Sequence, residues 1–237
     1  MKWISIATVL LVLVSVESTA QITIKTEYFG TSAYRDEHNQ KVGSSKGSAM
    51  VYHGSANLPL SMKKNESNQP TIWGIGLSGD YASLNNKNIA EPLVLSEILN
   101  LQMLLFHVRP LSEKWSMMAS VGVGVYTGDT RFSHLRFRNV LGSAGLVFVR
   151  RILPNLELGA GLALNNAFGY PMAFPALYVN WNYGHKLTCS FSALEGANLA
   201  VGYNVNKTFS ISFITEMGGQ MALTELNGDD KIFTHQY

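Results

Sequence analysis

Six histidines and many serines are the residues of this chain whose types could carry hydrolytic chemistry. His107, His134 or His185 could join a serine and an acid in a lipid-hydrolysing site, because an imidazole can activate a hydroxyl nucleophile. The sequence contains no nucleophile elbow and no H-E-x-x-H zinc motif. We therefore assign no catalytic residue. A lipid-modifying enzyme is the least favoured functional hypothesis, behind a pore and a plugged barrel.

Two charged segments could bind ligands. Arg131, Arg136 and Arg138 lie in one predicted loop, GDTRFSHLRFR, and guanidinium groups recognise lipid or polysaccharide phosphates well. The second segment, TELNGDDK, carries Glu225 and two aspartates but lacks the alternating carboxylates of a calcium loop. The arginines are therefore candidate binding residues, whereas the acidic segment indicates a solvated loop. No metal or cofactor is expected.

Gly74 to Gly79 reads G-I-G-L-S-G, which has the G-x-G-x-x-G spacing of a dinucleotide site. Such a site requires a turn that leads into a helix, with an acidic residue about 20 positions later. Here the glycines alternate with apolar residues, as they do in VGVGVYTG and LELGAGLAL. Glycines on one face of a strand instead indicate curvature and a crowded interior.

The element that must position these residues is seen most clearly in Lys114 to Gly128, KWSMMASVGVGVYTG. Large apolar residues alternate with small or weakly polar ones, and a period of two predicts a β-strand. The interior of the stretch carries no charge on either face, over roughly the 9–11 residues that cross a bilayer as a tilted strand. The pattern is typical of a strand in an outer-membrane β-barrel.

Composition agrees with this interpretation. Charged residues make up 14% of the chain, below the roughly 25% of ordinary soluble domains, while 46% of residues are hydrophobic. A net charge of +2 gives no reason to expect nucleic acid as a partner. The single cysteine, Cys189, allows no internal disulfide.

The first twenty residues have the pattern of a cleaved signal peptide. Lys2 precedes an apolar run from Ile4 to Val16, and Ser18-Thr19-Ala20 supplies small residues before Gln21. The sequence thus predicts a signal peptide at residues 1–20 and one barrel domain at residues 21–237, exported to the outer membrane of a Gram-negative cell. Outer-membrane lipids and the barrel assembly machinery are the expected partners.

Alternation continues along the mature chain and predicts an all-β, antiparallel, up-and-down transmembrane barrel of about twelve strands. Short and long connections roughly alternate, as in barrels with tight periplasmic turns and longer extracellular loops. Residues 95–109 are ambiguous, because leucine and methionine favour helix while the alternation favours strand. The last strand is predicted to be incomplete unless it begins inside TELNGDD.

The alternation also assigns residues to faces. The inward series predicts that the lumen is lined by Asp80, Glu157, Asn180, Asn182, Ser210, Ser212 and Glu216. Aromatic residues of the outward series are expected at the membrane interface. The predicted girdle consists of Trp73, Trp115, Trp181, Tyr183 and Tyr203, all at one rim.

Five segments resemble those of a known family. They are the signal peptide ending STAQ, the start ITIKTEYFGTS and the strands GIGLSGDY, VGVGVYTG and LELGAGLAL. The chain resembles the outer-membrane β-barrel proteins of Bacteroidota, in particular a family described as a domain of unknown function. The resemblance implies a location and a fold, with no activity or site residues. The leading functional hypothesis is a narrow pore or small-ligand conduit, and the main alternative is a plugged structural or binding barrel that acts through its loops.

Overall fold

The structure is a computed structural model that describes residues 21–35, 38, 40–88, 95–165, 172–184, 186–193, 197–206, 209–217, 219–226 and 229–236. The predicted signal peptide, residues 1–20, lies outside these ranges. No helix in the described residues is long and apolar enough to cross a membrane.

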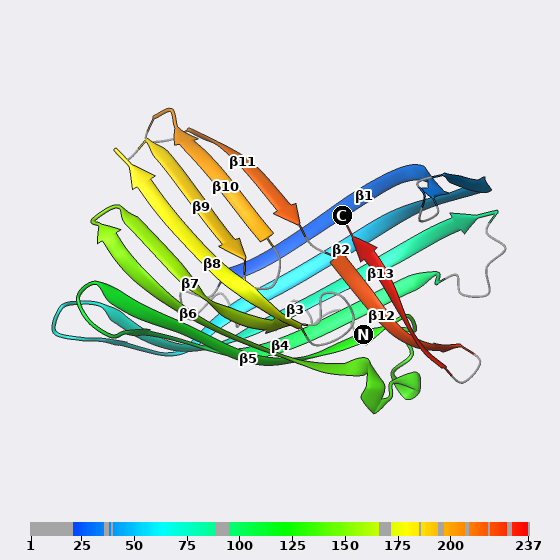
Figure 1. The fold of residues 1–237 in the computed structure, drawn as a ribbon, viewed down its shortest axis with the longest axis horizontal. Coiled ribbons are helices and arrows are strands. Elements are labelled where there is room, and N and C mark those ends of the chain that lie inside the picture. Colours follow the sequence, from blue (N-terminus) through cyan, green and yellow to red (C-terminus); the bar gives the residue numbers. More distant parts are fainter. Residues whose placement is uncertain are drawn as a thin grey trace, which may run out of the picture.

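In the described residues, eleven strands form a single sheet in which each strand pairs with its neighbours in sequence (Figure 1). All of the pairs are antiparallel, so the predicted all-β, up-and-down fold is confirmed. The strands are β1 (Gln21–Arg35), β2 (Lys41–Lys64), β3 (Pro70–Lys87), β4 (Glu97–Pro110), β5 (Trp115–Thr127), β6 (Val140–Leu153), β7 (Leu156–Asn165), β8 (Met172–Tyr183), β9 (Leu187–Ala193), β10 (Ala197–Asn204) and β11 (Ser210–Met217).

The strand β4 shows why alternation was the better guide in the ambiguous segment. Leu99, Leu101, Met103 and Leu105 share one face, and Asn100 and Gln102 share the other. Pairing on both sides with β3 and β5 fixes this segment as a strand despite the helix preference of leucine and methionine. The strand prediction for residues 95–109 is therefore confirmed from Glu97 onward, and residues 95 and 96 precede the strand.

The connections give the sheet two different ends. The tight-turn end holds residues 65–69, 111–114 and 154–155, and β8 and β10 also end there. The loop end holds residues 128–139, and β1, β3, β7 and β9 also end there. The connection between β5 and β6 contains two short 3-10 turns, η1 (Phe132–His134) and η2 (Phe137–Asn139).

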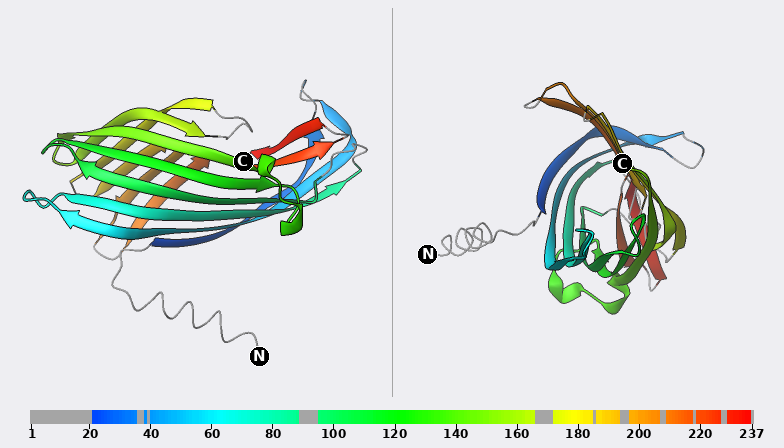
Figure 2. Two further views of the ribbon diagram at one scale, coloured as in Figure 1. Left: turned by 90° about the horizontal axis from the view of Figure 1, so that it is seen from below. Right: turned by 90° about the vertical axis from the view of Figure 1, so that its left-hand side faces the viewer.

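The sheet curls around an axis along its strands, which gives it a concave and a convex face (Figure 2). Within the described residues, β1 pairs only with β2 and β11 only with β10, so the sheet remains open. The predicted barrel closure is therefore not seen. Two further strands, β12 (Gly219–Leu226) and β13 (Asp229–Gln236), form a separate hairpin. Within TELNGDD, residues 224–226 thus end β12 and residues 229–230 begin β13.

Two clusters of buried apolar side chains lie on the concave face of the described sheet. One cluster brings Val51, Ala82 and Ile98 of three adjacent strands against Ala222 of β12. The other contains Val147, Val149, Ala163 and Ala176 of β6, β7 and β8. The hairpin therefore packs against the inside of the sheet, near the loop end of β2 to β5.

Candidate functional site: the concave face and its hairpin

All seven predicted lumen residues lie on strands whose register assigns them to the concave face. Directly paired residues share a face, and Asp80 pairs with Asn100, which contacts the hairpin. The remaining positions follow from the ladders that join β4 to β11. For Glu216 only the backbone is described, and its side chain lies outside the described part.

A row of polar side chains crosses the concave face at mid-sheet. The register aligns Lys25, His53, Asp80, Asn100 and Tyr126 on five successive strands. His53 Nδ1 lies 2.5 Å from an Asp80 carboxylate oxygen, and Lys25 forms an ion pair of 3.0 Å with Glu27, also on β1. The face of these strands that the hairpin covers in part is therefore polar and charged.

The other predicted lumen residues lie toward the tight-turn end. Glu157 accepts a hydrogen bond of 3.3 Å from the Arg151 guanidinium and pairs across the strands with Asn180. The Asn182 amide donates to Asn180 at 3.5 Å. Ser210 and Ser212 lie on β11, opposite Asn204 and Gly202, and both are exposed.

The hairpin is fixed to the sheet by two asparagine side chains. Asn100 donates to the Met221 carbonyl at 2.6 Å and accepts from the Met221 N–H at 3.2 Å. Asn139 donates to the Leu223 carbonyl at 2.7 Å. These amides satisfy backbone groups on the edge of β12 that faces away from β13, where another strand would otherwise pair. The residues at this junction, Asn100, Asn139 and Met221, are all buried.

An ion pair between the Arg138 guanidinium and the Glu225 carboxylate connects the hairpin to the β5–β6 connection. Sequence reasoning placed these two residues in separate loops, and the fold brings them together over a separation of 87 residues. Sequence reasoning did not select Asn100 or Asn139, because an inward asparagine in a strand is unremarkable until its partner strand is known.

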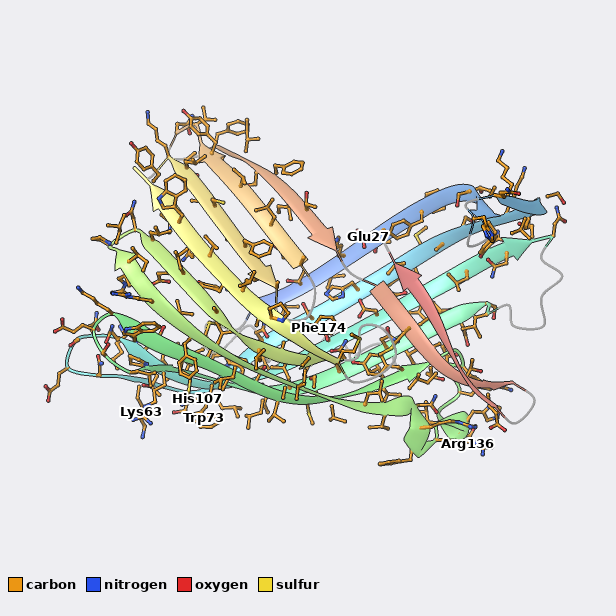
Figure 3. The ribbon with its side chains drawn as sticks, viewed as in Figure 1. Glu27, Lys63, Trp73, His107, Arg136 and Phe174 are labelled. Carbon is orange, nitrogen blue, oxygen red and sulfur yellow. The ribbon has the colours of Figure 1, made fainter. Side chains whose placement is uncertain are left out.

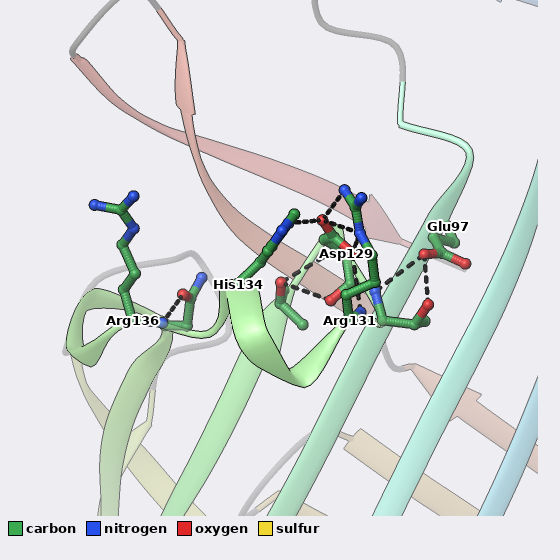
Figure 4. Close-up of polar contacts among 8 residues, drawn as sticks. Glu97, Asp129, Arg131, His134 and Arg136 are labelled. Carbon is green, nitrogen blue, oxygen red and sulfur yellow. Dashed lines mark hydrogen bonds and ion pairs between the residues drawn. The ribbon is translucent and has the colours of Figure 1, made fainter.

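The predicted arginine loop is held together by its own contacts (Figure 4). The Asp129 carboxylate accepts a hydrogen bond of 2.7 Å from the Arg131 guanidinium and lies 2.7 Å from His134 Nδ1. The hydrogen bond from Arg131 holds the pKa of the Asp129 carboxyl well below its usual range. Glu97 accepts from the backbone and the hydroxyl of Thr130 at 3.0 and 2.8 Å, which anchors the loop to β4.

Of the three predicted binding arginines, two already have carboxylate partners inside the protein. Arg131 is paired with Asp129 and Arg138 with Glu225. The Arg136 backbone N–H donates to the Asn139 side chain at 2.9 Å, and its guanidinium points away from the cluster in Figure 4. The side chains of Arg131 and Arg138 thus help to hold the shape of the connection, whereas Arg136 contributes its backbone N–H.

The five predicted girdle residues all lie near the tight-turn end of their strands. Trp73 is stacked on His107, with ring centroids 4.0 Å apart, and the Arg150 guanidinium lies 5.5 Å from the Trp115 ring. Trp181 and Tyr183 have centroids 5.7 Å apart, and Tyr203 is exposed at the end of β10. The structure thus brings Arg150 and His107 into the aromatic group, and sequence reasoning missed both cross-strand contacts.

The convex face is apolar and exposed. Twelve large apolar side chains of β3 to β8 lie on it with exposed fractions of 37–65%. The register places all of them on the face opposite Asn100. They are Leu77, Leu101, Met103, Leu105, Val121, Val123, Leu146, Phe148, Leu158, Leu162, Leu164 and Leu177.

The structure places no hydroxyl nucleophile on the candidate histidines that it describes. His107 Nδ1 lies 3.0 Å from the Ile72 carbonyl oxygen, and the His134 ring contacts Asp129. His185 lies outside the described residues. In the described ranges, no three His, Cys, Asp or Glu side chains gather closely enough to hold a metal ion.

By its fold, this chain is an all-β protein built on a single up-and-down antiparallel sheet. Residues 16–237 match the family model described as a domain of unknown function, DUF6268, and the chain belongs to that family. No curated protein and no solved structure matches the chain significantly.

Proposed function

We propose that this protein is an outer-membrane β-barrel whose convex face contacts lipid and whose concave face forms a narrow passage for small solutes. The observation that carries the proposal is the separation of the two faces. Exposed leucine, valine and phenylalanine side chains cover one face, and the polar row from Lys25 to Tyr126 crosses the other.

The size of the apolar face supports a membrane environment. Soluble monomers rarely expose contiguous apolar patches larger than a few hundred Å², whereas twelve large side chains are exposed together here. From Met117 to Val125, β5 advances about 26 Å at about 3.3 Å per residue, with no charged side chain. At the tilt of about 35–45° found in barrel strands, this stretch rises by about 19–22 Å along the membrane normal, which is most of the apolar band of about 25 Å on known outer-membrane barrels.

The strand directions suggest how the sheet closes. In an up-and-down sheet β1 and β11 run the same way, so they cannot pair in antiparallel fashion. Only residue 218 separates β11 from β12, and in Figure 1 the two strands run in the same direction. If the hairpin leaves Asn100 and Asn139, so that β11 and β12 act as one strand of the wall, β13 is antiparallel to β1 and can pair with it. The resulting barrel has twelve strands, the even number expected for a bacterial barrel.

The hairpin favours restricted flow over a wide pore. It lies against the inside of the sheet, and its edge is held by the buried amides of Asn100 and Asn139. The same contacts favour the second candidate, a plugged barrel that acts through its loops. The two candidates differ in whether the folded protein conducts ions.

Planar-bilayer conductance of the refolded protein tests the proposal. We expect a small conductance from the native chain and a larger one from Asn100→Leu, because leucine cannot satisfy the Met221 N–H and carbonyl. Leaving these groups unpaired weakens the docked hairpin by about 1–3 kcal/mol. Asn57→Leu is the matched control, since Asn57 lies on the same face and has no hydrogen bond to the hairpin in the described structure. If the native protein and the Asn100→Leu variant are both folded and neither conducts ions, the result would favour the plugged barrel.

A further inference from the structure

Three cations on the convex face at the tight-turn end have no acidic partner among the residues that the structure describes. Lys63, Arg109 and Arg150 lie on β2, β4 and β6, close to the turns at residues 65–69, 111–114 and 154–155. Among the residues that the structure describes, no carboxylate is within ion-pair distance of any of the three. At the loop end, by contrast, Arg131 and Arg138 are both neutralised.

Register determines how these cations are arranged. Lys63 pairs with Thr71, Arg109 with Met117, and Arg150 with Trp115, so all three belong to the outward series. Strands lie about 4.8 Å apart, so cations on alternate strands are spaced by roughly 10 Å along the rim. That spacing is on the scale of neighbouring lipid headgroups.

Aromatic side chains lie between the cations and the apolar face. The Trp115 ring lies under the Arg150 guanidinium, and Trp73 stacks on His107. Figure 3 shows Lys63, Trp73 and His107 together at the tight-turn end, with Arg136 at the opposite end. In the described part of the chain, no acceptor lies within hydrogen-bond distance of the Trp115 indole N–H. This donor is therefore also available to a headgroup oxygen.

We propose that this rim binds the phosphodiester headgroups of anionic phospholipids, through Arg109, Arg150 and Lys63 with Trp115 beneath them. The inference rests on the proposed function, since it requires that the convex face contact lipid. Guanidinium and ammonium groups supply the charge that a phosphate needs. The acyl chains then lie along Phe148, Leu146 and Leu158, which are exposed next to these cations on the same face.

The experiment compares two brominated lipids as quenchers of Trp115 fluorescence. The protein carries Trp73→Phe and Trp181→Phe and lacks the predicted signal peptide with Trp3, which leaves Trp115 as its tryptophan. It is reconstituted in phosphatidylcholine bilayers that contain either brominated phosphatidylcholine or brominated phosphatidylglycerol. We expect phosphatidylglycerol to be favoured around Trp115 by about fivefold for each cation that contacts a headgroup.

The double variant Arg109→Gln and Arg150→Gln should lose this preference. Arg151→Gln is the matched control, because Arg151 is the next residue on the same strand, faces the other side and is paired with Glu157. It should retain the preference of the parent protein. Added inorganic phosphate should leave the preference unchanged, since a site for free phosphate would be blocked by it.

The possible failures are distinguishable. Equal quenching by the two lipids in the parent protein would overturn the phospholipid site while leaving the membrane barrel intact. Loss of the preference in Arg151→Gln, or its removal by inorganic phosphate, would also overturn the site. Absence of quenching by either lipid would show that Trp115 does not face the bilayer, and the proposed function would fail with it.

Discussion

Val123→Arg is expected to block assembly of the protein into membranes. Val123 lies near the middle of β5 on the convex face and is 43% exposed, between Met103 of β4 and Gly142 of β6. An arginine on the lipid face at the bilayer midplane costs about 2–4 kcal/mol. The assembled fraction should therefore fall by roughly thirty- to several-hundred-fold, measured by the yield of folded, protease-resistant protein after refolding into vesicles.

Ser120→Arg is the control for this prediction. Ser120 lies three residues earlier on the same strand and faces the concave side, opposite Phe106 and Gly145. The same charge should be tolerated there because that face is polar and not exposed to hydrocarbon. Equal assembly of the two arginine variants would show that the faces are assigned wrongly.

Gly161→Ala should destabilise the folded sheet strongly. A Cβ atom at Gly161 would lie 1.9 Å from the Leu146 carbonyl oxygen and 2.7 Å from the Val147 Cα. Both atoms belong to the backbone of β6, so no side chain can rotate away and the strands must shift apart. Overpacking of this kind costs about 1–3 kcal/mol, and more where the backbone cannot relax. The midpoint of urea unfolding in vesicles should move to lower concentration accordingly.

Gly142→Ala provides the comparison, because the nearest atom to its Cβ would be the Gly122 carbonyl oxygen at 3.8 Å. Gly142 lies on the convex face of β6, where the methyl group has room. The free energy of unfolding should change by no more than about 0.5 kcal/mol, as for ordinary surface substitutions, so the urea midpoint should hardly move. A similar loss of stability in both variants would mean that Gly161 is not under special packing constraint.

Local pattern was enough to predict the strands and the faces. The period of two in β4 and β5 correctly identified both strands, and direct pairing then placed Leu101, Met103 and Val123 on the same side. Alternation is visible in sequence because it depends only on successive residues along one chain segment. The inward positions of Gly122, Gly124 and Gly161 followed from the same pattern, and Gly161 shows the close approach that such positions allow. Gly79, by contrast, pairs with Leu101 and lies on the convex face.

The hairpin and its contacts could not be predicted in this way. Asn100 meets Met221 across 121 residues, and Asn139 meets Leu223 across 84. Such contacts depend on how the whole sheet curls. The pairing of Arg150 with Trp115 was missed for a related reason, since β6 has weak alternation and its register against β5 is set by the neighbouring strands.

The central claim is that the convex face of this sheet contacts membrane lipid while the concave face does not. A spin-label scan of β4 tests it most directly. Single cysteines replace residues 101–106 in turn, in a Cys189→Ala background, and the protein is reconstituted in bilayers. We expect accessibility to oxygen, which concentrates in lipid, to peak at 101, 103 and 105 and to fall at 102, 104 and 106. Uniform accessibility to a water-soluble nickel chelate, or a period near 3.6 residues, would contradict the account.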